Sequence, residues 1–169
     1  MSALAIRTAL AGDAPVLLSL IRGLADYERL AHEVVATEAQ LATELGAAHP
    51  VVHALVAEQD GEAVGFALYF FSFSTFVGRQ GLYLEDLYVR PASRGRGIGR
   101  ALLGELARRA AARGCGRMEW SVLDWNVDAQ RFYEGLGARP MAEWTVWRLD
   151  RAGIDALGYD QPPTTRRAP

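Results

Sequence analysis

The chain has 169 residues, of which 50% are hydrophobic and 22% charged, and its net charge is −2. This size and composition are typical of one globular domain with a substantial core. The small net charge argues against a general nucleic-acid-binding protein, and no apolar stretch reaches the roughly 18 residues of a membrane span, so we expect neither nucleic acid nor membrane as a partner.

The first part of the chain is expected to form one strand and two helices. Residues 3–8 are a short strand candidate. Asp13 can cap a helix whose apolar residues recur at helical spacing as far as residues 27–28. The run Thr37–Gln40 has the form of a capping box and predicts a second, shorter helix that ends near Gly46.

The middle of the chain is expected to form three strands. Residues 51–57 and 62–72 flank Asp60-Gly61, a dipeptide typical of a hairpin turn. Residues 73–81 are expected to form a loop or an irregular hairpin. The third strand follows at 82–89, and it carries two adjacent carboxylates in an otherwise apolar run.

The last part of the chain alternates helices and strands. Residues 97–113 predict a helix that ends before Gly114. A strand is expected at 117–123, and Asn126 can cap a helix that runs to about residue 134. A last strand is expected at 141–149.

This order of elements predicts an α/β fold with a mixed sheet. No linker interrupts residues 1–160, so one domain is expected there. The polar, proline-rich tail 161–169 is expected to be disordered.

A glycine-rich turn follows the strand with the two carboxylates. Closely spaced backbone N–H groups at the start of a helix, with arginines beside them, are what a pyrophosphate needs. The glycines are spaced G-x-G-x-G, so the dinucleotide fingerprint does not fit, and the Gly-Lys-Ser/Thr of phosphate loops is missing. Taken alone, this turn could also be a glycine-rich loop with solvated arginines that binds no ligand.

Two motifs together resemble the GNAT superfamily of N-acetyltransferases. The turn reads R-x-x-G-x-G at Arg94, Gly97 and Gly99, which is similar to the acetyl-CoA-binding motif of that superfamily. A second superfamily arrangement, N-x-x-A/S-x-x-F-Y-x-x-x-G-F/A, is matched by Asn126, Ala129, Phe132, Tyr133, Gly137 and Ala138. The resemblance implies a GNAT-like fold, which is a single α/β domain over 1–160 with a mostly antiparallel sheet flanked by helices. It also implies acetyl-CoA as co-substrate.

Several segments further resemble the diamine (spermidine/spermine) acetyltransferase branch. They follow the expected order over most of residues 4–150, at 6–7, 20–22, 24–28, 64–70, 83–86 and 147–149. The resemblance implies acetyl transfer to a primary amine of a small molecule, either a polyamine or diamine or an amino acid of the thialysine type. It also implies a homodimer, for which Trp144, Val146 and Trp147 are candidate interface anchors.

The resemblance assigns two catalytic residues. An alkylammonium group has a pKa of roughly 10, so it must lose a proton before it attacks a thioester directly. Glu85 matches the base of the family, and Tyr133 matches the residue that protonates or hydrogen-bonds the CoA sulfur. A substrate-binding or merely exposed acid is the alternative role of Glu85.

The resemblance also assigns residues that bind the cofactor and residues that bind the acceptor. The implied cofactor-binding residues are Leu87, Tyr88, Val89, Arg94, Gly95, Arg96, Gly97, Ile98, Gly99, Arg100, Asn126 and Tyr133. The implied acceptor-binding residues are Tyr27, Glu28, Glu85 and Asp86. In a regular strand Asp86 points to the face opposite Glu85, unless a β-bulge re-aims it. Thr145 stands where the diamine enzymes carry a glutamate, which weakens the case for long polyamines and leaves shorter amines and amino acids open.

Two other functions stay open at this point. A protein or peptide N-acetyltransferase would need an open peptide groove, whereas residues 70–81 are large and aromatic enough to cover one. A non-catalytic acyl-CoA-binding regulatory module would be expected to have lost Glu85 and Tyr133, and both are present.

The cysteine and histidine residues indicate the expected cellular compartment and whether a metal site is expected. Cys115 is the only cysteine and the N-terminus has no signal-peptide pattern, so a cytoplasmic location is expected. His32, His49 and His53 lack metal-ligand spacing, so no metal is assigned.

Overall fold

The computed structural model describes residues 3–159, and the contacts within the chain divide it between Ser121 and Val122 into two compact units. The first unit holds a β-sheet with its helices, and the second holds two further helices. The expectation of one domain over 1–160 stays a prediction. The expected disordered tail, 161–169, lies outside the described residues.

Five strands of the first unit form one sheet in the order β1-β2-β3-β4-β5. They are β1 (Leu4–Thr8), β2 (His53–Gln59), β3 (Glu62–Ser74), β4 (Arg79–Val89) and β5 (Arg117–Trp120). Neighbours from β1 to β4 are antiparallel, whereas β5 is parallel to β4. Helix α3 (Ile98–Ala112) makes the crossover that this parallel pair requires. The α/β fold with a mixed, mostly antiparallel sheet is confirmed.

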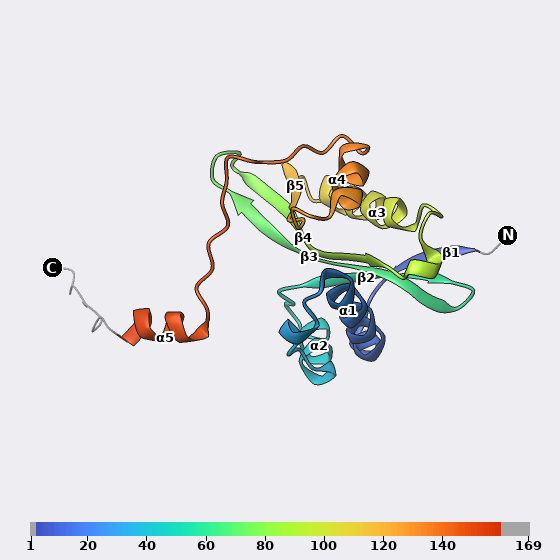
Figure 1. Ribbon diagram of the computed structural model, residues 1–169, viewed down its shortest axis with the longest axis horizontal. Helices are drawn as coiled ribbons and strands as arrows, with labels where there is room; N and C mark the ends of the chain where they lie inside the picture. Colours follow the sequence, from blue (N-terminus) through green and yellow to red (C-terminus); the bar gives the residue numbers. More distant parts are fainter. Residues whose placement is uncertain (1–2, 160–169) are drawn as a thin grey trace. The chain divides into compact units, whose positions relative to one another are not determined.

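The helices of the first unit cover both faces of this sheet. Helices α1 (Ala14–Glu28) and α2 (Glu38–Leu45) lie on one face and α3 on the other (Figure 1). Leucines 17 and 20 of α1 are fully buried in a core cluster with Phe66 of β3 and Tyr88 of β4. Three single-turn 3₁₀ helices join these elements, η1 (Ala11–Asp13), η2 (Ala31–Glu33) and η3 (Pro91–Ser93).

Two local sequence motifs form the structures that they predict, a helix start and a hairpin turn. The Thr37 hydroxyl accepts a hydrogen bond from the Gln40 backbone N–H, and the Gln40 side chain accepts one from the Thr37 N–H, which is the capping box that begins α2. Asp60 and Gly61 both have positive φ, 53° and 81°, and join β2 to β3. The loop predicted at 73–81 is shorter, because β3 continues to Ser74 and β4 begins at Arg79.

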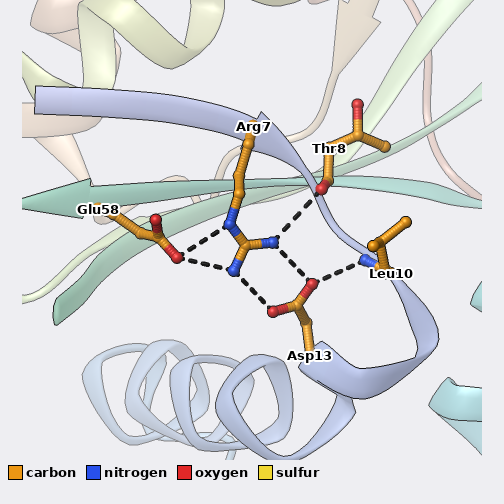
Figure 2. A network of polar contacts seen from close by, with 5 residues as sticks. All are labelled: Arg7, Thr8, Leu10, Asp13 and Glu58. Atoms are coloured by element: carbon orange, nitrogen blue, oxygen red, sulfur yellow. Dashed lines mark hydrogen bonds and ion pairs between the residues drawn. The ribbon is translucent and has the colours of Figure 1, made fainter. Parts of the chain in front are cut away.

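Asp13 ties the start of α1 to the sheet rather than capping α1 with its side chain. Its carboxylate accepts hydrogen bonds from both Nη atoms of Arg7 at 2.8 Å and from the Leu10 N–H at 2.7 Å (Figure 2). Arg7 of β1 also donates to Glu58 of β2 at 2.7 and 2.9 Å. The Arg7 guanidinium lowers the pKa of Asp13. One guanidinium thus joins two strands and the entry to α1.

The second unit contains α4 (Val127–Glu134) and α5 (Arg151–Tyr159). The strand predicted at 141–149 is wrong, because the segment forms no strand and its residues are exposed, Trp147 to 91%. A segment with strand-forming residues becomes a strand only where a neighbouring strand pairs with its backbone. Helix α5 was not predicted. Within residues 3–159, no helix is both long and apolar enough to cross a membrane.

Candidate active site

Strand β4 carries the two predicted carboxylates at a β-bulge. Leu84 pairs with Tyr69 and Asp86 pairs with Leu68, so Glu85 is the extra residue between two registers. Glu85 is exposed and Asp86 is half-buried. Beyond the bulge Asp86 shares a strand face with Tyr88, which belongs to the core cluster under α1. The bulge therefore presents Glu85 to solvent and directs Asp86 toward the α1 face.

Two further carboxylates, Glu85 and Glu28, act electrostatically on Asp86. Burial, followed by the negative charges of Glu85 and Glu28, raises the pKa of Asp86 to about 6. Burial also raises the pKa of Glu28, the last residue of α1. A cation placed among these groups would relieve their repulsion and stabilise the charged carboxylates. The acidic cluster of Glu28, Glu85 and Asp86 is therefore suited to a cationic amine.

The backbone of β4 has an open edge beside the acidic cluster. The Arg90 N–H donates to the Val64 carbonyl at 2.8 Å. Since hydrogen-bonded pairs alternate along an antiparallel ladder, the N–H and C=O groups of Leu87 and Val89 point away from β3. The pairing of β4 with β5 ends at Leu84, so among the described residues this edge has no strand partner beyond that point. Such an edge can bind an extended ligand chain.

The glycine-rich turn between β4 and α3 fits a pyrophosphate. Gly95 and Gly97 have φ of 74° and 80°, and Gly97 is the N-cap of α3. A Cβ at either position would meet no atom within 4 Å, so the backbone conformation, rather than crowding, requires glycine there. The open space around the turn and the first-turn N–H groups of α3 are of the kind that suits an anion. Around them, Ile98 is buried, Gly99 half-buried, and Arg96 and Arg100 exposed.

Arg94 of this turn has a contact that the sequence did not reveal. Its Nε donates to the Val89 carbonyl at 2.9 Å. Its guanidinium carbon lies 4.6 Å from the centre of the Tyr27 ring and 5.6 Å from that of Tyr88. From the sequence, Arg94 was assigned only to cofactor binding and Tyr27 only to acceptor binding. The two residues lie far apart in the chain, and no sequence motif indicates that they are in contact.

The remaining predicted residues belong to the second unit. Asn126 is buried, and its side chain accepts a hydrogen bond from the Ala129 N–H at 3.2 Å, so it caps α4 as predicted. Tyr133 is half-buried in the last turn of α4, with its ring 5.3 Å from that of Phe132. Thr145 is exposed in the segment 141–149.

No group of three His, Cys, Asp or Glu side chains in residues 3–159 is arranged to hold a metal ion. The chemistry described so far is that of carboxylates, a tyrosine, arginines and backbone N–H groups.

Comparison with known proteins points to one family. A sequence model of the acetyltransferase (GNAT) family matches residues 20–138. The thialysine N-epsilon-acetyltransferase of Bos taurus is 41% identical over 165 residues, which cover 93% of this chain and 96% of that protein. The L-ornithine N5-acetyltransferase of Arabidopsis thaliana is 32% identical over 197 aligned positions, with coverage of 90% and 86%.

The fold is likewise similar to solved structures. An integron cassette protein from the mobile metagenome of V. cholerae superposes with a TM-score of 0.77 at 27% sequence identity, and the match covers 92% of this chain and 98% of that one. The similarity therefore extends over nearly the full length of both chains.

Proposed function

Because this chain belongs to the acetyltransferase (GNAT) family and is an acetyl-CoA-dependent N-acetyltransferase of small-molecule amines, we propose that its acceptor is the side-chain amine of a small amino acid, of the thialysine or ornithine type. The observation that carries this proposal is the acidic cluster of Glu28, Glu85 and Asp86, where repulsion between carboxylates favours a bound cation. Thr145 adds no further carboxylate, which favours a short acceptor over a long polyamine.

We propose that acetyl-CoA binds along the open edge of β4 and over the turn. The N–H groups of Leu87 and Val89 suit the pantetheine arm, and Gly95, Gly97 and the start of α3 suit the pyrophosphate. Arg96 and Arg100 would add charge-assisted hydrogen bonds. When bound, acetyl-CoA supplies the acetyl group as a thioester.

We assign the proton transfers to Glu85 and Tyr133. The acceptor ammonium gives one proton to Glu85, directly or through water, and its nitrogen then bonds to the acetyl carbon to form a tetrahedral intermediate. As this intermediate collapses, the carbon–sulfur bond breaks and the nitrogen releases its second proton to water. Tyr133 gives a proton or a hydrogen bond to the leaving sulfur. The exposure of Glu85 at the bulge supports its access to the amine. Asp86 is the second candidate for the base, because its pKa of about 6 suits proton transfer near neutral pH.

Thiol release from acetyl-CoA against a panel of amines tests the acceptor class. The panel contains thialysine, ornithine, lysine, putrescine, spermidine, spermine and a peptide with a free N-terminus. We expect the highest kcat/KM with thialysine or ornithine. A higher value with spermidine or spermine would overturn the proposed acceptor class and leave the N-acetyltransferase activity in place.

The same panel separates the remaining functions. Turnover of the peptide alone would favour a protein or peptide N-acetyltransferase. Tight acetyl-CoA binding with no turnover of any amine would favour a non-catalytic acyl-CoA-binding module.

We further propose that the enzyme is a cytoplasmic homodimer. Trp144 and Trp147 are 70% and 91% exposed, and Val146 between them is 81% exposed, which supports burial of this segment in an interface. Having a single cysteine is compatible with a reducing compartment. Light scattering after size-exclusion chromatography should give twice the mass of one chain, and the double variant Trp144→Ser, Trp147→Ser should shift the protein toward monomer.

A further inference from the structure

One contact joins the cofactor turn to the acceptor side of the first unit. Arg94 lies in the turn before α3, and Tyr27 lies in the last turn of α1. The Arg94 guanidinium carbon is 4.6 Å from the Tyr27 ring centre, a distance typical of a cation–π contact. Tyr27 is followed directly by Glu28 of the acidic cluster. The two proposed substrate sites thus meet at one pair of side chains.

The Arg94 guanidinium is held by a hydrogen bond and by two aromatic rings. Its Nε donates to the Val89 carbonyl at 2.9 Å, on the open edge of β4. Tyr88 lies 5.6 Å away and is buried, with its hydroxyl so close to α1 that a Cβ on Gly23 would fall 2.8 Å from it. Because a guanidinium stacks through its face and donates hydrogen bonds through its edge, the Nη edge can bind an anion while the stacking is kept.

The end of α1 has a backbone conformation that its surroundings must stabilise. Arg29 closes the helix in a left-handed conformation with φ of 62°, which a non-glycine residue adopts only where its surroundings hold it. Tyr27 is 37% exposed, so core packing alone does not fix its ring. The position of Glu28 follows that of Tyr27, since both belong to the same helical turn. A contact that holds Tyr27 would therefore also order Glu28 and the end of α1.

We propose that Arg94 is a positioning residue that couples the two substrate sites. An anion in the turn holds the Arg94 guanidinium, Arg94 holds Tyr27, and Tyr27 orders the end of α1. CoA and the amine then bind with positive cooperativity, because binding of the first ligand already orders the end of α1 and the second ligand loses less conformational entropy on binding. By linkage, each ligand raises the affinity of the other by the same factor. This inference rests on the proposed function, since it requires CoA at the turn and the amine at the end of α1.

Hydrogen–deuterium exchange with free CoA tests the coupling without any acceptor. In the wild type we expect CoA to slow exchange both in the turn, residues 94–101, and at the end of α1, residues 24–30. The amides of Arg29 and Leu30 report on this end directly, since they donate to the carbonyls of Asp26 and Ala25. Protection of the turn without protection of 24–30 overturns the inference and leaves the proposed function intact. A turn that CoA does not protect overturns both.

Variants of Tyr27 identify the contact that transmits the effect. Tyr27→Phe keeps the ring over Arg94 and should keep the protection of 24–30. Tyr27→Leu removes the ring, so CoA should protect the turn as in the wild type but leave exchange at 24–30 unchanged. Each variant is compared with its own CoA-free state, which separates the coupling from any general loosening of α1. Equal protection of 24–30 in the Phe and Leu variants contradicts the proposed role of the ring.

The coupling is then measured with thialysine as the probe amine. Its Kd is determined by calorimetry with and without saturating CoA, and the ratio gives the coupling factor. We expect a factor of at least about 5 in the wild type, at the lower end of typical couplings, and a factor near 1 in Arg94→Lys, which keeps the charge but loses the planar stacking. Arg96→Lys is the matched control from the same turn, which should weaken CoA binding and retain the factor. A factor that Arg94→Lys leaves unchanged overturns the proposal.

Discussion

The carboxylate of Asp86 on β4 is repelled by that of Glu28 at the end of α1; burial first, and then the negative charges of Glu85 and Glu28, raise the pKa of Asp86 to about 6. The folded state therefore binds a proton at Asp86 more tightly than the unfolded chain, in which the ordinary pKa is 3.8. It follows that the contribution of Asp86 to stability decreases as the pH rises from about 4 to about 6. Above that range the protein carries an unfavourable, half-buried charge, which an amine ligand would neutralise.

Asp86→Asn should therefore stabilise the protein at pH 8 and not at pH 4. The expected gain in the free energy of unfolding at pH 8 is at most about 3 kcal/mol, because each pKa unit corresponds to about 1.4 kcal/mol. Urea denaturation at the two pH values measures it. Glu62→Gln, at an exposed position on β3, serves as the control and should show no such pH dependence. Equal effects of Asp86→Asn on the free energy of unfolding at both pH values would mean that the surroundings of Asp86 do not destabilise its charged form.

Glu85→Gln and Asp86→Asn should change different kinetic parameters. With Glu85 as the base, Glu85→Gln should lower kcat by about 100-fold or more, the usual contribution of general base catalysis. Asp86→Asn should chiefly raise the KM of the amine and remove the fall of kcat/KM below about pH 6, where Asp86 becomes protonated. Steady-state rates from pH 5 to 9 distinguish the two. If Asp86→Asn instead abolishes kcat while Glu85→Gln retains it, Asp86 is the base.

Gly97→Val should prevent acetyl-CoA binding through the backbone of the turn. Gly97 has φ of 80° and caps α3, and a β-branched residue strains this conformation even though no neighbouring atom obstructs its Cβ. Gly104→Ala is the matched control, because Gly104 lies inside α3, where alanine is favoured by roughly 1 kcal/mol. Calorimetric titration with CoA should give no binding for the first variant and wild-type affinity for the second. Normal binding by Gly97→Val would reject the turn as the pyrophosphate site.

Asp13→Asn should destabilise the protein at neutral pH and have little effect in acid. The Arg7 guanidinium lowers the pKa of Asp13, so the stabilisation is present above the ordinary pKa of 3.8 and is lost as the pH falls through the lower folded-state value. Loss of charge-assisted hydrogen bonds predicts a cost of about 1–3 kcal/mol at pH 7. Thermal unfolding at pH 7 and pH 3 checks this. A cost that is the same at both pH values would assign the effect to packing instead of charge.

Features of the fold that depend on neighbouring residues could be predicted from the sequence. Thr37 and Gln40 bond each other within one helical turn, and Asp60 and Gly61 form a turn by their own conformations. Features that depend on distant partners could not. Residues 141–149 were predicted as a strand, yet a strand also requires a partner, and the described structure pairs none with this segment.

The candidate site divides in the same way. Glu85 was assigned by its match to a position of the resembled family and the glycines of the turn by their motif, since each prediction depends on a short stretch of sequence. The pairing that leaves Glu85 in a bulge depends on the register with β3, and the contact of Arg94 with Tyr27 depends on how α1 packs on the sheet. A single sequence carries neither kind of information in its local pattern.

Tyr133→Phe should lower kcat while leaving CoA affinity near the wild-type value. The hydroxyl is proposed to act on the sulfur only as the carbon–sulfur bond breaks, so its removal raises the barrier without weakening ground-state binding. We expect kcat to fall by about 100-fold, in line with the loss of one general acid. Since Tyr133 lies on α4 beside Phe132, the ring that remains in the variant should preserve the local packing.

Single-turnover kinetics and CoA titration measure kcat and CoA affinity separately. Phe132→Leu is the control, because it disturbs the neighbouring ring and keeps the hydroxyl, and it should retain most of the turnover. Unchanged turnover in Tyr133→Phe would assign the proton of the thiol to water or another group.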